Sequence, residues 1–177
     1  MSPHSALPAI DAQGLMEAFA GWGSAATVVT VNGADGMPCG VGASAAGPVS
    51  QDPPLIHVTL WRSPAARRVL GNSTFAVNVL SQVQAEGARR IARGSASGLV
   101  WRNDGGVPVL SGNTATIVCA PWNVYDGGDH VLLVGEVLKY NLGAARPLVL
   151  GYGLQSGTDE GGLQPMPVLW SWGRSGL

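Results

Sequence analysis

The sequence has few charged residues and no excess of either sign. Only 12% of its 177 residues are charged, and the formal net charge is -1. A protein that follows a nucleic-acid backbone needs a basic excess to neutralise phosphates, so we expect no nucleic-acid partner. Hydrophobic residues make up 46% of the chain. Because obligate dimer interfaces are apolar, this balance predicts a homodimer.

Long apolar runs, signal-peptide features and clusters of metal ligands are also lacking. No run approaches the roughly 18 residues that a membrane-spanning helix needs, so we expect a cytoplasmic protein with no membrane partner. Cys39 and Cys119 lie in apolar, strand-like contexts. They are predicted to be buried free thiols, with a disulfide as the less favoured alternative. No His and Cys spacing fits a closed metal site, so no metal is expected.

The order of apolar and turn-forming segments predicts one domain made mainly of β-strands. We expect a flexible N-terminus over residues 1–10 and a single domain over 11–177, of which 154–177 form a C-terminal tail. Residues 94–112 are rich in Gly, Ser and Asn and predict a loop. The predicted strands cover residues 26–32, 40–54, 55–61, 74–80, 114–125, 130–140 and 147–152, and the predicted helices begin at Asp11, Ser63 and Gln82. Six or seven strands with a few short helices favour an antiparallel β-barrel.

Several segments, in this order, resemble one known family. The strings AATVVTV, VSQDPPLIHVTLWRS, FAVNVLSQVQAEGARRIA, GVPVLSGNTATIVC, GDHVLLVGEV and PLVLGYG occur between residues 25 and 153. Over about residues 15–153 the chain resembles the flavin reductase-like family, the FMN-binding split barrels that supply reduced flavin to two-component monooxygenases. The resemblance implies a split β-barrel of six to seven strands.

The segment that holds the flavin in that family has lost its polar middle here. Residues 40–54 read GVGASAAGPVSQDPP, whereas the family pattern resembles GMTVSSFTSVSLDPP. Ser44 is kept. Threonine is replaced by Gly42, and the run Ser-Phe-Thr-Ser is replaced by four residues without hydroxyls or rings, which are Ala45, Ala46, Gly47 and Pro48. The resemblance makes these six residues the candidate pocket, or former flavin site.

The phosphate end of the implied flavin site is altered in the same way. Family members have Arg-Ser-x-Thr after the strand, and this chain has Arg62, Ser63, Pro64 and Ala65, so the arginine and one hydroxyl remain. Trp61 completes the candidate pocket. Each lost hydrogen bond removes about 0.5–1.5 kcal/mol of net binding, or about 1.5–3 kcal/mol when the acceptor is charged. Three or four losses weaken binding by a factor on the order of a thousand, although backbone amides could compensate.

The residues that meet the nicotinamide in the family are retained. Asp129 and His130 lie in an intact Gly-Asp-His motif, and Tyr152 resembles the tyrosine beside the pyridine nucleotide. His130 and Tyr152 are therefore the candidate catalytic residues. The alternative for His130 is a structural role in a tight turn that opens a strand.

Two functional hypotheses follow from this combination, and a non-catalytic binding barrel is a third. In the first, the altered pocket binds a small apolar organic substrate without any cofactor and promotes its cyclisation, rearrangement or cycloaddition in secondary-metabolite biosynthesis. In the second, the chain is an NAD(P)H:flavin oxidoreductase that uses FMN or FAD and passes reduced flavin to an oxygenase partner. The loss of polar groups from the candidate pocket favours the first hypothesis, and the second is its alternative.

Overall fold

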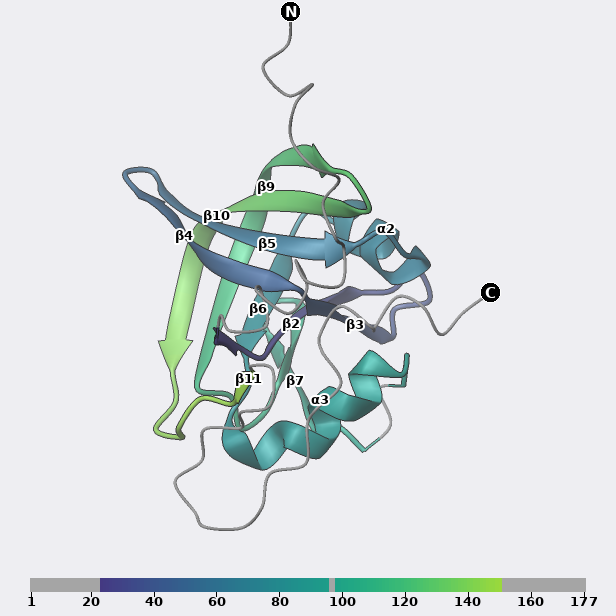
Figure 1. The fold of residues 1–177 in the computed structure, drawn as a ribbon, viewed down its shortest axis with the longest axis vertical. Coiled ribbons are helices and arrows are strands. Elements are labelled where there is room, and N and C mark those ends of the chain that lie inside the picture. Colours follow the sequence, from purple (N-terminus) through teal and green to yellow (C-terminus); the bar gives the residue numbers. More distant parts are fainter. Residues whose placement is uncertain (1–22, 96–97, 151–177) are drawn as a thin grey trace, which may run out of the picture.

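The computed structural model describes residues 23–95 and 98–150 (Figure 1). The N-terminus, the predicted helix at Asp11, Tyr152 and the C-terminal tail lie outside these residues. The elements in chain order are β1 (Ser24–Ala25), β2 (Thr27–Asn32), β3 (Pro38–Ala43), β4 (Ala45–Gln51), β5 (Pro54–Trp61), α2 (Pro64–Leu70), β6 (Phe75–Val79), the short 3-10 helix η1 (Gln82–Gln84), α3 (Ala85–Ala92), β7 (Trp101–Asp104), β8 (Val107–Leu110), β9 (Ala115–Gly127), β10 (His130–Leu142) and β11 (Val149–Leu150). The fold is mainly β, as predicted.

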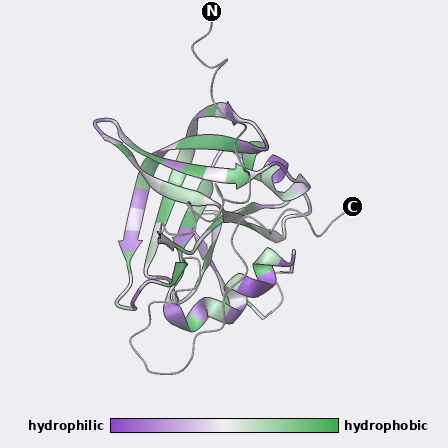
Figure 2. Cartoon of the chain, viewed as in Figure 1, coloured by the Kyte–Doolittle hydropathy of each residue, from purple (hydrophilic) through white to green (hydrophobic). Residues whose placement is uncertain are grey.

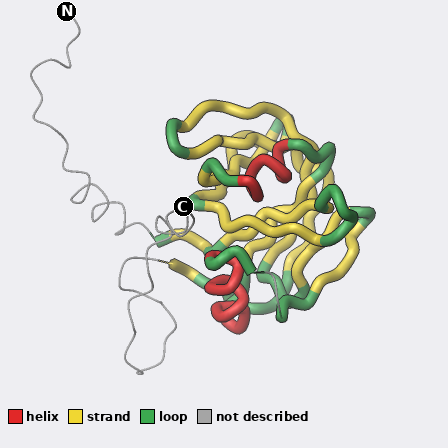
Figure 3. Tube along the Cα trace, turned by 90° about the vertical axis from the view of Figure 1, so that its right-hand side faces the viewer, coloured by secondary structure: helices red, strands yellow, loops and turns green. Residues whose placement is uncertain are grey.

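Seven strands form one antiparallel sheet that curls into a split barrel (Figures 1 and 3). Their order is β3-β2-β6-β9-β10-β5-β4, so the two edge strands, β3 and β4, are consecutive in the sequence. Only Ser44 separates them. Strand β3 pairs with β2, whereas β4 pairs with β5. The predicted strand over residues 40–54 therefore consists of two strands, and the chain passes from one edge of the sheet to the other at Ser44.

Alternate side chains of these strands build the core. Val29, Val31, Val58, Leu60 and Phe75 are fully buried in one cluster inside the barrel. Burying each such side chain stabilises the fold by about 1.5–3 kcal/mol, which follows from the apolar area removed from water. A second cluster lies beside α3 and includes Val28 and Ile91. Figure 2 shows apolar residues along the strands and alternating apolar and polar residues along α3.

Both cysteines are free thiols, as predicted. Cys119 is fully buried on β9, whereas Cys39 on β3 is only partly buried. Burial raises the pKa of the Cys119 thiol to about 12, because a thiolate loses its hydration inside the core. Cys119 is therefore a protonated packing residue at neutral pH.

The predicted helices have identifiable starts and stops. The Ser63 hydroxyl accepts a hydrogen bond from the Ala66 N–H at 3.1 Å, Pro64 occupies the first turn, and α2 ends before Gly71. These are the capping features on which the prediction rested. The predicted helix over residues 82–92 is present as η1 followed by α3. No helix among the described residues is long and apolar enough to cross a membrane.

The loop predicted over residues 94–112 is wrong in its second half. Strands β7 and β8 form an antiparallel ribbon there, joined by Gly105 and Gly106. Both glycines have positive φ, 67° and 92°, which suits a tight turn that twists with its strands. Val107 and Val109 are buried. The ribbon was missed because its strands have four residues each and β7 is largely polar.

Candidate functional site

His130 is the first residue of β10 and lies at the place where the barrel closes. The register places it opposite Trp61, the last residue of β5. Only 6% of its side chain is exposed. Its Nδ1 atom lies 2.6 Å from Asp129 Oδ1, and its Nε2 atom lies 2.9 Å from Ser44 Oγ. The Trp61 ring meets the imidazole edge-on, with ring centroids 5.0 Å apart.

These contacts select one form of the imidazole ring. An ionised carboxylate only accepts hydrogen bonds, so Nδ1 carries the proton that is donated to Asp129. In the neutral ring Nε2 is then an acceptor, and the Ser44 hydroxyl donates to it. Ser44 is the residue that joins the two sheet edges. His130 is thus held in a fixed orientation against the strand crossover.

The strand register separates the predicted pocket residues into two groups. Ala45 lies opposite Thr59, and Gly47 lies opposite His57, so these positions share a face with Trp61 and His130. The intervening residues of β5, Val58 and Leu60, point into the core, and Ala46 packs against that core. Pro48 pairs with Ile56 on the same side as Ala46. Ala45 and Gly47 belong to the face of His130, whereas Ala46 and Pro48 do not.

Gly42 is not brought to this face either. It lies opposite Val28 on β2, and Val28 belongs to the cluster beside α3. Gly42, which stands where the family pattern has threonine, therefore lies on a different part of the barrel wall from His130. Of the six predicted pocket residues, Ser44 contacts His130 directly, and Ala45 and Gly47 share its face of the sheet.

His57 lies on the same face of the sheet as His130, further along β5, and packs against Gly47. A Cβ atom built on Gly47 would lie 3.1 Å from His57 Cε1, so the imidazole ring packs over the glycine. His57 is partly buried, and its ring has no hydrogen-bond partner among the described residues. The glycine at position 47 leaves room for the His57 ring. The sequence alone could not show this contact, because it depends on the register of β4 against β5.

Arg62 and Ser63 hold the surrounding structure in place. Arg62 Nε donates to the Gly128 carbonyl at 2.7 Å, and Nη2 lies 2.8 Å from Asp126 Oδ1. The Gly128 N–H and the Arg62 guanidinium lower the pKa of the exposed Asp126 carboxyl, in that order. Arg62 therefore braces the β9–β10 turn that carries His130. The Ser63 hydroxyl caps α2.

The residues around His130 fit a flavin ring held mainly by backbone groups. Strand β4 is an edge of the seven-stranded sheet, so one side of its backbone is not paired within that sheet. A flavin ring carries both hydrogen-bond donors and acceptors, which such an edge complements. The small residues Ala45 and Gly47 let a planar ligand approach the strand closely, and Ser44 adds one hydroxyl. Among the described residues no group of three or more His, Cys, Asp or Glu could hold a metal ion.

A comparison with protein families supports the resemblance to flavin reductases. The model of the family described as "Flavin reductase like domain" matches residues 19–154, which is more than half of the chain.

Curated relatives have the same kind of name. The chain is 33% identical over 135 residues to a "Probable flavin reductase" of Rhizobium meliloti, covering 73% of this chain and 43% of the relative. It is 32% identical over 161 residues to the "NADH-dependent FAD reductase" of Streptomyces globisporus, covering 82% and 87%. It is 36% identical over 128 residues to the "Actinorhodin polyketide dimerase" of Streptomyces coelicolor, covering 70% and 72%. The matched region spans less than two thirds of the length of the "Probable flavin reductase".

A solved structure shares the fold over most of both chains. The NADH:FAD oxidoreductase of Streptomyces globisporus, determined in complex with NAD and FAD fragments, superposes with a TM-score of 0.74 at 29% identity and covers 82% of this chain and 93% of that one.

Proposed function

The chain belongs to the flavin reductase-like family, and on that premise we propose that it is an NAD(P)H:flavin oxidoreductase that supplies reduced FMN or FAD to an oxygenase. One observation carries the proposal. The hydrogen bond between His130 and Ser44 holds the histidine of the Gly-Asp-His motif at the start of the edge strand β4. A flavin ring would lie along this strand. The names of most relatives point the same way, and this favours the reductase over the flavin-independent activity preferred from sequence.

The roles of the residues follow from their positions. When bound, the flavin supplies the redox chemistry, because it accepts a hydride equivalent from the reduced nicotinamide. Ser44 and the unpaired side of β4 would hold the flavin ring, and Trp61 would exclude water from one end of the site. His130 would orient the nicotinamide through a ring whose proton position is set by Asp129. Tyr152 keeps its predicted role beside the pyridine nucleotide.

A homodimer is part of the proposal, and two exposed half-strands support it. Strand β9 pairs with β6 only as far as Cys119, and β10 pairs with β5 only from His130 to Glu136. The other half of each strand is exposed. These halves carry large apolar side chains, namely Trp122, Val124, Tyr125, Leu138, Tyr140 and Leu142. A second copy would remove this apolar surface from water. A cytoplasmic location stays a prediction.

A second candidate function rests on the small residues that share a face of the sheet with His130. Ala45 and Gly47 leave the site's wall without the hydroxyls that the family resemblance implies, and one relative is named as a polyketide dimerase. A small apolar organic substrate could be held there in a reactive conformation and cyclised or rearranged without a cofactor. Fewer observations support this activity than support flavin reduction.

Turnover with flavin tests the proposed function. We expect the purified protein to oxidise NADH or NADPH when FMN or FAD is added, and His130→Ala to lower kcat/KM by more than tenfold because the nicotinamide is no longer oriented. His57→Ala is the matched control, since this histidine lies on the same face but further along the strands. Unchanged turnover in His130→Ala would contradict the role given to His130.

A further inference from the structure

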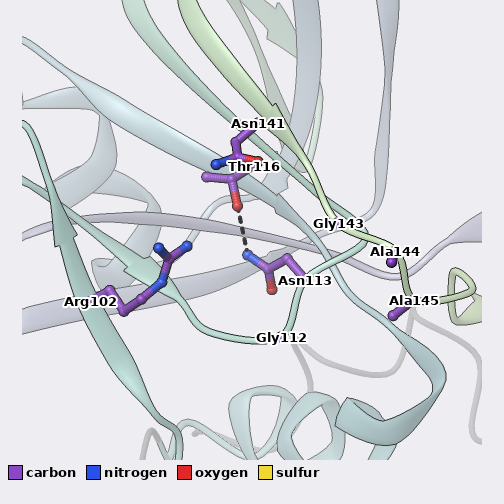
Figure 4. A pocket seen from close by; sticks show the side chains of 8 residues that line it. All are labelled: Arg102, Gly112, Asn113, Thr116, Asn141, Gly143, Ala144 and Ala145. Carbon is purple, nitrogen blue, oxygen red and sulfur yellow. Dashed lines mark hydrogen bonds between the residues drawn. The ribbon is translucent and has the colours of Figure 1, made fainter.

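A hollow lies beside the end of the β9–β10 hairpin that is opposite to His130, and Figure 4 shows the residues that line it. Asn141 lines it near the end of β10, eleven residues after His130, which corresponds to roughly 35 Å along a strand. The hollow has a volume of about 290 Å³, and none of its eight lining residues is acidic. It is therefore a separate site from the one described above.

One wall of this hollow is a buried polar network that leaves one donor unused. Asn113 Nδ2 donates to Asn78 Oδ1 at 2.8 Å and to Thr116 Oγ1 at 2.9 Å, and Asn113 Oδ1 accepts from Gln84. Thr116 is only 4% exposed. Its oxygen accepts from Asn113, but its own hydrogen has no acceptor among the described residues. An acceptor bound in the hollow would satisfy this buried hydroxyl.

The opposite wall supplies positive charge. Arg102 on β7 forms no ion pair or hydrogen bond with the part of the chain that the structure describes, and Figure 4 shows its guanidinium group reaching towards Asn113 and Thr116. The nearby carboxylate of Asp104 is already neutralised, because Lys139 Nζ lies 2.5 Å from it. That ion pair also joins β7 to β10. The charge of Arg102 is therefore not balanced by this neighbour.

The remaining wall offers further hydrogen-bond donors. The turn after β10 places Ala144 and Ala145 at the hollow, and their backbone N–H groups have no acceptor among the described residues. The Asn141 side chain lies beside Thr116 (Figure 4). An arginine fork, a buried hydroxyl and unpaired backbone amides, all from residues that line one hollow, are the kinds of donor that recognise an oxyanion.

We propose that this hollow binds the oxyanion group, phosphate or carboxylate, of a small molecule. Its volume is near the lower limit of ligand pockets, roughly 300 Å³, so it admits a molecule larger than a single anion but smaller than a dinucleotide. The proposal does not depend on flavin reduction, because none of the residues involved belongs to the His130 site.

Calorimetric titration of the full chain with pyrophosphate and with citrate, at low salt, tests the proposal. We expect at least one probe to bind, and both Arg102→Gln and Thr116→Val to weaken that binding by tenfold or more. Thr116→Ser, which keeps the hydroxyl, should bind like the wild type, as should Arg93→Gln, which removes an exposed arginine outside the hollow. Pyrophosphate binding alone would identify a phosphate ligand, and citrate binding alone a carboxylate.

Two results would overturn the proposal. One is the absence of binding of either probe up to about 1 mM, which corresponds to about -4 kcal/mol. The other is an equal loss of affinity in Arg102→Gln and Arg93→Gln, which would indicate non-specific attraction between charges. Arg102 is exposed, so its variant should fold even if Thr116→Val does not.

Discussion

Replacing Ser44 by alanine removes one hydrogen bond from the point where the barrel closes. The hydroxyl lies 2.9 Å from His130 Nε2, and His130 is 5% exposed, so water does not readily replace the lost partner. A buried polar atom left without a partner costs about 1–3 kcal/mol. In a protein of this size, each kcal/mol lowers Tm by about 2–4 °C. We therefore expect Ser44→Ala to lower Tm by about 2–12 °C.

Ser50→Ala is the control for this prediction. Ser50 is also partly buried on β4, and its hydroxyl forms no hydrogen bond among the described residues. Thermal and urea unfolding of both variants give the comparison, and ¹⁵N NMR of the imidazole reports whether Nδ1 still carries the proton. Equal stability losses in the two variants, with an unchanged tautomer, would refute the reasoning about His130.

Two further predictions concern the neighbours of His130. Gly47→Val should push the His57 ring away and cost about 1–3 kcal/mol of unfolding free energy, and His57→Ala should relieve much of that cost; equal costs in both backgrounds, measured by urea unfolding, would show that the two residues do not touch. The lowered pKa of Asp126 means that its ionised form is favoured in the fold, so this contribution is present above about pH 4 and is lost as the pH falls through the folded-state pKa. Asp126→Asn should therefore show a smaller loss of stability on acidification than the wild type, and identical acid-unfolding curves would contradict the pairing with Arg62.

The sequence was informative where local chemistry decides structure. β-Branched runs predicted β2 and β5, and the Ser63-Pro64 pair predicted the start of α2. The predictions were wrong or incomplete where the structure depends on pairing between segments that are distant in the sequence. Whether residues 45–51 continue beside β2 or change to β5 depends on the bend at Ser44. Strands β7 and β8 have only four residues each, and β7 is largely polar, so the ribbon does not stand out in the sequence.

The candidate site was predictable in part, for the same reason. His130 and Ser44 were named from the family motifs, but their contact was not predicted. Ala45 and Gly47 share a face of the sheet with His130, whereas Ala46 faces the core. This follows from the strand register, which the sequence alone does not reveal. Arg62 was assigned to the flavin phosphate, yet in the structure its side chain binds the turn before β10.

Titration of the purified protein with FMN and FAD, read by flavin fluorescence and followed by addition of NADH, tests the central claim most directly. We predict that one flavin binds with micromolar affinity or better and that NADH bleaches its visible absorption. A protein that binds neither flavin would contradict the reductase assignment and favour a flavin-independent reaction at the His130 face.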